Sequence, residues 1–253
     1  MSKVFQGISK TDARAMSSDN DMIKLWAHEC QRVFSDRLIS QEDRDQFMDM
    51  LKQKIKERFK KDYDKIVEVK PLLFASFVPT LYAEGDVDKK KPLGDVYCEL
   101  TDRAKMEKKC DTALAEFNTV NRSKKMDLVL FTDAIEHIVK IHRVITTQYG
   151  NALLVGVGGS GRKSLTELAN FIAGFDIVSL EMQKGYDIGM WRDDMRDKLF
   201  LACGYEKELR PLVFLFSDTQ IINEAFLEDV NNILNNGKIP NLYNRDHESV
   251  IIE

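Results

Sequence analysis

A glycine-rich turn between an apolar run and a helical pattern constrains the fold of this chain more than any other feature. Residues 152–157 (ALLVGV) form a continuous apolar run, which predicts a strand buried on both faces of a parallel sheet. The turn follows as Gly156-Val157-Gly158-Gly159-Ser160-Gly161-Arg162-Lys163-Ser164. A helix is expected from about residue 164. Strand, glycine turn and helix in this order predict a loop whose backbone N–H groups hold phosphate.

The turn matches the phosphate-loop pattern GxxxxGK[ST] only in part. Gly156 and Gly161 stand at the two glycine positions. The lysine position holds Arg162, and the hydroxyl position holds Lys163. Arg162 can still bind phosphate through its planar guanidinium group, whereas Ser164 has to reach further to contact Mg²⁺. A glycine-rich turn that binds no ligand is the structural alternative.

A carboxylate is expected at the end of a second buried strand, predicted over residues 212–217 (LVFLFS). Hydrolysing P-loop enzymes usually carry adjacent acids there, but this chain has Ser217 followed by Asp218. Asp218 is therefore the candidate for Mg²⁺ and for polarising the attacking water, with a helix cap or a strand-end hydrogen bond as the alternative. Because phosphoryl transfer depends on positioning and electrostatic stabilisation, these losses predict binding with little hydrolysis.

Strands and helices alternate through the second half of the chain. Beyond the segments already named, strands are expected over residues 176–180 and from 250, and helices over 164–173, 187–202 and 224–235. This alternation is typical of a parallel α/β sheet.

The first half of the chain is predicted to be helical. Helices are expected over residues 21–38, 41–61, 101–118 and 132–145. Ser40, with Asp43 three residues later, is a favourable N-cap for the second of them. Thr101 and Thr132 are the expected caps of the third and fourth. The charged stretch 84–95, which contains Gly and Pro, is the best candidate for a linker or loop.

Composition excludes several classes of protein. The 253 residues allow one or two domains, and the net charge of −4 argues against a general nucleic-acid binder. The four cysteines form no CxxC pair, which favours free thiols in a reducing compartment. The N-terminus has no apolar leader, and the apolar runs are too short to span a bilayer. We therefore expect neither nucleic acid nor membrane as a partner.

Several segments together resemble the AAA+ motor ring of dynein heavy chains. They are LWAHECQRVFSDRLI…EDR, MDLVLFTDAIEHIVKIHRVI, ALLVGVGGSGR, KGY…WRDD and FLFSDTQI…FLEDVNNILNNGKIPNLY. The form GVGGSGR, in place of a plain GKT or GKS, is similar to axonemal rather than cytoplasmic dyneins. The resemblance implies an α/β AAA+ P-loop parallel sheet with flanking helices, preceded by a small all-α subdomain. It assigns residues 1–100 to the small helical subdomain of the third module and 101–253 to an incomplete large subdomain of the fourth.

The resemblance also implies a site and a ligand. Gly156 to Lys163 correspond to the Walker A loop, Ser217 to the Walker B aspartate and Asp218 to its glutamate. The backbone near Val129 and Leu130 would lie against the adenine. In the family this site is regulatory and binds ATP or ADP, with Mg²⁺ as a further candidate. The main hydrolysis occurs in the first module, which lies outside this sequence.

The implied partners are the adjacent AAA+ modules of the ring. Dynein intermediate and light chains and the microtubule are implied through the rest of a parent microtubule-motor ATPase. The implied location is the cytoplasm and cytoskeleton, in the axoneme of cilia or flagella. Two alternatives stay open. One is a structural ring module that binds no nucleotide. The other is an independent P-loop ATPase or kinase, which would need an intact lysine and carboxylate pair.

Overall fold

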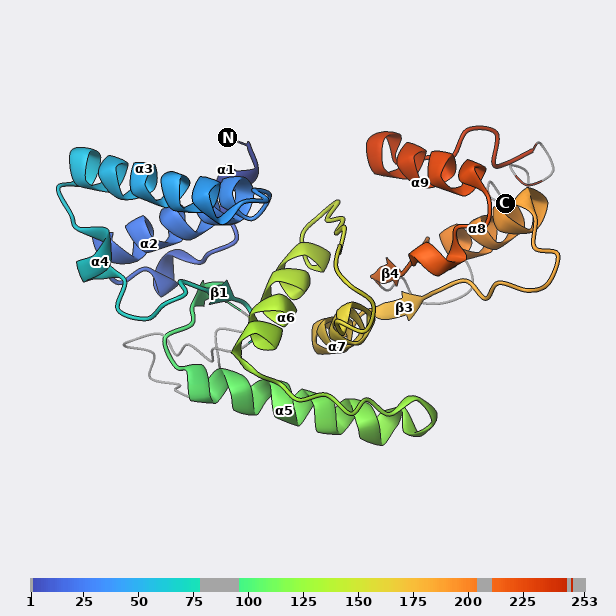
Figure 1. Ribbon diagram of the computed structural model, residues 1–253, viewed down its shortest axis with the longest axis horizontal. Helices are drawn as coiled ribbons and strands as arrows, with labels where there is room; N and C mark the ends of the chain where they lie inside the picture. Colours follow the sequence, from blue (N-terminus) through green and yellow to red (C-terminus); the bar gives the residue numbers. More distant parts are fainter. Residues whose placement is uncertain (1, 78–95, 204–210, 245–246, 248–253) are drawn as a thin grey trace. The chain divides into compact units, whose positions relative to one another are not determined.

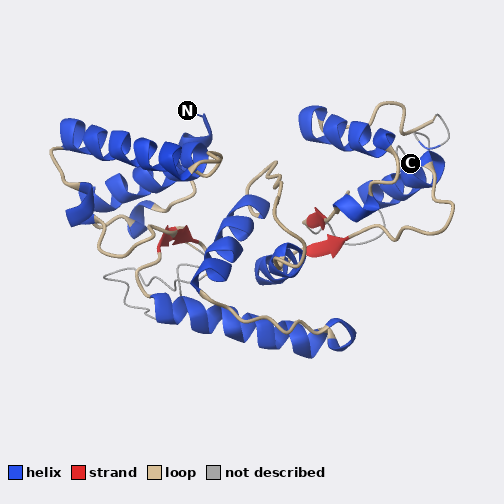
Figure 2. Ribbon diagram, in the orientation of Figure 1, coloured by secondary structure: helices blue, strands red, loops and turns tan. Residues whose placement is uncertain are grey.

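The chain folds into two compact units, Met1–Arg143 and Val144–Glu253. The computed structural model describes residues 2–77, 96–203, 211–244 and 247 (Figure 1). Helices dominate both units, and the strands are short (Figure 2). The mixed α/β class predicted from the sequence is therefore confirmed, with a small parallel sheet in the second unit.

The first unit consists of helices around a two-stranded antiparallel ladder. Its elements are α1 (Ser2–Ile8), α2 (Asp19–Cys30), α3 (Gln41–Phe59), α4 (Tyr63–Ile66), β1 (Phe74–Ala75), β2 (Cys98–Glu99), α5 (Arg103–Val120) and α6 (Thr132–Ile145). A π-helical turn, Gln31–Ser35, extends α2. The predicted helix over 21–38 is thus an α-helix that begins at Asp19 and passes into this wider turn.

Helix caps in this unit test the local predictions. Ser40 caps α3 as predicted, because its hydroxyl accepts from the Asp43 N–H at 3.1 Å. The predicted cap of α5 is wrong by one residue. Asp102, not Thr101, is the N-cap, and its carboxylate accepts from the Lys105 N–H at 2.9 Å. Aspartate is at least as good a cap as threonine, and here its charge also faces the positive end of the helix.

The apolar core of the first unit lies between α2, α3, α4 and the short strands. Leu25, Ala27 and Ile55 have no exposed surface, and Phe74 is 1 % exposed. Burying one such large aliphatic or aromatic side chain contributes about 1.5–3 kcal/mol. The helices of this unit therefore pack on an apolar core formed by the unit's own side chains.

The second unit contains the predicted alternation of strands and helices. Its elements are α7 (Arg162–Ala173), β3 (Asp176–Val178), α8 (Ile188–Ala202), β4 (Leu212–Phe214) and α9 (Glu224–Asn236). β3 and β4 pair in parallel, with Asp176 opposite Leu212. Trp191 of α8 stacks on Phe226 of α9, with ring centroids 4.5 Å apart. Parallel strands joined through a helix are the unit from which α/β sheets are built.

The predicted buried strand over residues 152–157 is wrong for the described structure. Leu153, Val155 and Val157 are 89 %, 85 % and 80 % exposed, and no ladder joins this segment to another described strand. An apolar run is buried in a sheet only where strands flank it on both sides. Among the described residues, β3 and β4 pair with each other and neither pairs with residues 152–157. The strand expected from residue 250 lies outside the described residues.

Candidate functional site

The glycine turn contains two residues whose backbone conformation favours glycine. Gly159 and Gly161 have φ angles of 78° and 75°, in the left-handed region that favours glycine. A Cβ atom at Gly158 or Gly159 would meet nothing within 4 Å. The glycines are therefore not needed for packing within the described chain. Their absence of side chains leaves the loop backbone open to a ligand.

Arg162 fastens the loop to the helix that follows. It is the first residue of α7, and its guanidinium donates to the Leu154 carbonyl at 3.4 Å and to the Val157 carbonyl at 3.2 Å. Arginine has five N–H donors, so these two bonds leave capacity for a phosphate oxygen. The side chain predicted to hold phosphate is thus positioned at the loop, where it also stabilises the loop backbone.

The first turn of α7 carries positive charge where helices favour negative charge. Arg162 and Lys163 both lie in this turn, which contains no acidic residue. Cations at a helix N-terminus oppose the helix dipole, and anions there are stabilised by it. A bound anion would reverse this unfavourable local arrangement. Lys163 is exposed and Ser164 is half-buried, so both can reach a ligand at the turn.

Asp218 begins a short 3₁₀ turn, Asp218–Gln220, soon after β4. Its carboxylate is exposed and accepts from the Thr219 N–H at 3.0 Å. This contact is the strand-end hydrogen bond that the sequence left open as an alternative. The same carboxylate has a second oxygen, which can still bind a cation.

Gln220 is a site residue that sequence reasoning missed. Its side-chain N–H₂ donates to the Leu180 carbonyl at 2.5 Å and to the Ser179 hydroxyl at 3.2 Å. Its side-chain oxygen accepts from the Ser217 N–H at 2.6 Å. Gln220 therefore joins the segments that follow β3 and β4 and holds the backbone beside Asp218. The spacing of Ser217 and Gln220, a capping-box pattern, is the signal that could have revealed it.

Val129 and Leu130 lie in the irregular segment before α6. Val129 is 82 % exposed. The start of the segment is held by Asn118 of α5, whose side-chain amide donates to the Met126 carbonyl at 2.9 Å and accepts from the Met126 N–H at 2.7 Å. Val129 and Leu130 belong to the unit Met1–Arg143, whereas the glycine turn belongs to the unit Val144–Glu253.

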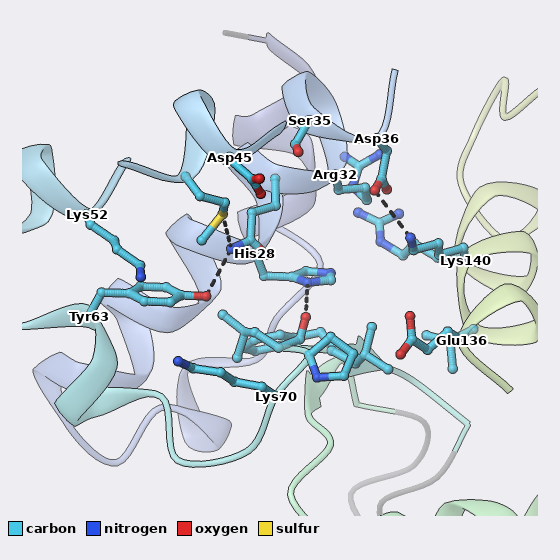
Figure 3. A pocket seen from close by; sticks show the side chains of 18 of the residues that line it. His28, Arg32, Ser35, Asp36, Asp45, Lys52, Tyr63, Lys70, Glu136 and Lys140 are labelled. Atoms are coloured by element: carbon cyan, nitrogen blue, oxygen red, sulfur yellow. Dashed lines mark hydrogen bonds and ion pairs between the residues drawn. The ribbon is translucent and has the colours of Figure 1, made fainter. Parts of the chain in front are cut away.

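A cavity of about 530 Å³ lies in the first unit, among α2, α3, α4 and α6 (Figure 3). His28 is buried in its wall, where its Nδ1–H donates to the Leu72 carbonyl at 3.0 Å. Desolvation by burial lowers the pKa of His28 to about 4. Lys52 and Lys70 both pair with Asp64. None of the predicted site residues lines this cavity, so it does not belong to the phosphate loop.

A cluster of metal-ligating side chains and a membrane-spanning helix are both absent from the described part of the chain. It contains no group of three His, Cys, Asp or Glu side chains able to hold a metal ion. No described helix is long and apolar enough to cross a membrane. The cysteines are free thiols, as predicted. Burial raises the pKa of Cys110 to about 12, which keeps that thiol protonated and unreactive near neutral pH.

Comparison with known families decides the class of the chain. The family model described as the P-loop containing dynein motor region D4 matches residues 126–253. The chain belongs to this dynein motor region family. A second model, the AAA+ lid domain, matches residues 1–70. The resemblance to dynein heavy chains is therefore confirmed, and so is the AAA+ P-loop fold with a preceding helical part.

Curated relatives of this dynein motor region are axonemal heavy chains. Dynein axonemal heavy chain 1 of Homo sapiens is 41 % identical over 254 residues, which cover 100 % of this chain and 6 % of the relative. Dynein axonemal heavy chain 6 of Homo sapiens is 39 % identical over 97 % of this chain and 6 % of the relative. For dynein axonemal heavy chain 2 of Mus musculus the identity is 41 %, over 97 % of this chain and 5 % of the relative. This dynein motor region thus spans 5–6 % of the length of these relatives.

Proposed function

We propose that the chain is part of an axonemal dynein heavy chain and binds ATP or ADP at a regulatory or structural AAA+ site. The observation that carries the proposal is the first turn of α7. There, Arg162 and Lys163 follow two left-handed glycines at the positive end of a helix. Glycine backbone, helix N-terminus and two cations are the elements of a phosphate site.

The described residues have distinct roles in this proposal. Backbone N–H groups from Gly156 to Gly161 approach the phosphates, and Arg162 and Lys163 neutralise their charge. Ser164 and Asp218 are the candidate ligands for Mg²⁺, since hydroxyl and carboxylate oxygens suit that ion. The backbone near Val129 and Leu130 is the proposed adenine contact.

We propose that hydrolysis by this segment is slow. Asp218 is exposed and bonded to the backbone N–H of its own neighbour. Ser217, which by the resemblance stands at the Walker B aspartate position, bonds to Gln220. Phosphoryl transfer needs a positioned base and a metal-bound phosphate. One exposed carboxylate is poorly suited to position the attacking water or to hold the metal ion. The expected behaviour is retention of nucleotide without rapid turnover.

The wider assignments follow from the relatives. Residues 1–100 are proposed as the small subdomain of the third AAA+ module, and 101–253 as part of the large subdomain of the fourth. The adjacent modules of the ring are the proposed direct partners. Dynein intermediate and light chains and the microtubule are proposed partners of the parent protein. Its proposed place is the axoneme, where it would contribute to ciliary or flagellar motility.

A pair of glycine variants tests nucleotide binding. Gly159 and Gly185 both have left-handed φ angles, 78° and 82°, and open space around the Cβ position. Replacing either by alanine imposes a similar backbone strain of about 1 kcal/mol. We expect Gly159→Ala to weaken the binding of a fluorescent ADP analogue by about tenfold, and Gly185→Ala to leave it unchanged. Equal affinities for the two variants would contradict the proposed loop.

A second candidate function is a structural module that binds no nucleotide. It is favoured by the two bonds from Arg162 to carbonyls of the loop segment, because they stabilise the loop without a ligand. Isothermal titration of the folded chain with ADP and with Mg-ATP separates the two functions. Binding in the micromolar range supports the nucleotide site, and no heat at millimolar nucleotide supports the structural module.

A further inference from the structure

A buried carboxylate joins several elements of the first unit. Glu29 of α2 has no exposed surface. It accepts from the Tyr97 hydroxyl at 2.8 Å and from the Arg32 guanidinium at 2.8 Å. A Cβ atom at Gly7 of α1 would lie 1.7 Å from a Glu29 oxygen, so the backbone of α1 lies against this carboxylate and leaves no room for a side chain.

Arg143 brings helix α6 to the same carboxylate. Its guanidinium lies 3.6 Å from Glu29, and only 5 % of the side chain is exposed. It also lies over the Tyr97 ring, 4.8 Å from the ring centroid. We call Glu29, Arg32, Tyr97 and Arg143 the Glu29 cluster. Breaking a buried charge cluster by removing one member leaves the others uncompensated.

A second ion pair repeats the connection at the surface. Lys140 of α6 lies 3.3 Å from Asp36, directly after the π-helical turn, and both side chains are partly exposed (Figure 3). Lys140 lies one turn before Arg143 on α6, and Asp36 lies two turns after Glu29. The acids lie in the segment matched by the AAA+ lid model, and the cations in the segment matched by the dynein motor region.

A tight turn connects α6 to the glycine loop. The Thr147 N–H donates to the Val144 carbonyl at 3.0 Å, and the Gly150 N–H donates to the Thr147 carbonyl at 2.8 Å. A Cβ atom at Gly150 would lie 1.9 Å from the Val144 carbonyl oxygen. The segment from Arg143 to Gly156 therefore begins with a hydrogen-bonded turn.

We propose that Glu29 is a positioning residue that fixes α6 to the lid segment and thereby couples the lid to the nucleotide loop. The coupling to nucleotide rests on the proposed function, whereas the fixing of α6 does not. Two sites are coupled when a change at one alters the binding free energy at the other. The Glu29 cluster supplies the physical connection, because it joins α2 to the helix that leads into the loop.

The test compares two carboxylate variants of the full chain. Glu29→Gln removes the negative charge of the cluster and leaves the guanidinium groups of Arg32 and Arg143 without a counter-charge. Glu99→Gln is the matched control, because the Lys24–Glu99 pair, at 2.9 Å and 14 % and 15 % exposed, joins α2 to β2 without touching α6. We expect amide hydrogen exchange in α6 to become on the order of tenfold faster in Glu29→Gln. The control is expected to leave α6 unchanged. Equal exchange of α6 in wild type and Glu29→Gln would overturn the proposal.

A second set of variants keeps the test decisive if Glu29→Gln fails to fold. Asp36→Asn removes the exposed Lys140–Asp36 ion pair and leaves no buried charge without a partner. We expect amide hydrogen exchange in α6 alone to become faster, by less than in Glu29→Gln. The double variant Glu29→Gln with Arg143→Met removes both charges of the buried pair. Because the two residues interact, we expect the double variant to lose less stability than the sum of the losses in the two single variants. Strict additivity of the single effects would overturn the buried connection.

Nucleotide affinity then separates this inference from the proposed function. If the wild type binds ADP, we expect affinity on the order of fivefold weaker in Glu29→Gln and unchanged in Glu99→Gln. Faster exchange of α6 with unchanged affinity would overturn the coupling. If the wild type binds no nucleotide, the proposed function fails, and the exchange of α6 alone decides whether Glu29 positions the helix.

Discussion

At the residue scale, buried ionisable groups in the first unit are the features that sequence patterns predict least well. Glu29 meets Tyr97, a residue 68 positions away, and no local spacing indicates such a contact. Arg162 and Asp218, by contrast, are predicted site residues because they stand at fixed positions after predicted strands, and their roles stay proposals. Local order in the sequence therefore suggests candidate site residues, whereas contacts that depend on distant packing cannot be predicted from it.

The two buried histidines make the fold sensitive to acid. Burial is the main cause that lowers the pKa of both His28 and His142 from 6.5 to about 4. The folded state therefore disfavours their protonation, so stability is retained above about pH 6.5 and falls as the pH drops from 6.5 toward 4. We expect the double variant His28→Gln with His142→Gln to flatten this part of the urea-unfolding profile against pH.

The matched control for acid sensitivity is His137→Gln, because His137 is exposed on α6. This variant is expected to keep the wild-type slope between pH 6.5 and 4. An unchanged slope in the double variant would show that other groups, such as carboxylates, cause the acid sensitivity.

At the element scale, helices were predicted better than strands. α3 begins where its cap predicted, and α9 ends at Asn236, one residue beyond the predicted end at residue 235. A helix satisfies its own backbone hydrogen bonds, so its sequence contains most of the information. A strand depends on neighbours, and the run 152–157 has none among the described strands. The same apolar composition that predicted burial therefore corresponds to exposed side chains.

Gln220 offers a test of how the two parallel strands are held at one end. Gln220→Ala removes the acceptor of the Ser217 N–H and the donor to the Leu180 carbonyl. Leaving buried polar groups without partners costs about 1–3 kcal/mol, so we expect a loss of stability of that size in urea unfolding. Gln183→Ala, at an exposed position in the same unit, is the control and is expected to change stability by less than about 0.5 kcal/mol. Equal effects would contradict the role of Gln220.

At the scale of the whole molecule, three divisions of the chain do not coincide. The resemblance divides it near residue 100, the family models leave residues 71–125 between them, and the compact units meet at residue 143. Helix α6 explains part of the difference, because it belongs to the dynein motor region by sequence, yet its Arg143 contacts Glu29 of α2 and its Lys140 contacts Asp36 after the π-helical turn. The helix at the start of one family segment can thus pack against the family segment that precedes it. Packing, rather than sequence similarity, decides which unit contains it.

The two units also carry separate fluorescent reporters, which allow a test at this scale. The chain has two tryptophans, Trp26 in the first unit and Trp191 in the second. Trp191 is fully buried against Phe226 and donates to Asp229 at 3.0 Å, so its emission reports the packing of α8 on α9. In the variant Trp26→Phe this signal is isolated. Ligand that binds only the folded state stabilises it by about 2.7 kcal/mol at a concentration of 100 Kd.

We therefore expect ADP to raise the thermal midpoint of the Trp191 transition, because the glycine loop lies in the same unit as that residue. Adding Gly159→Ala is expected to abolish the shift, whereas adding Gly185→Ala is not. If ADP raises the thermal midpoint reported by Trp26 in the variant Trp191→Phe by the same amount, the two units unfold together. A midpoint that ADP leaves unchanged while binding is measured would mean that the nucleotide does not stabilise the unit containing the loop, contrary to the proposed site.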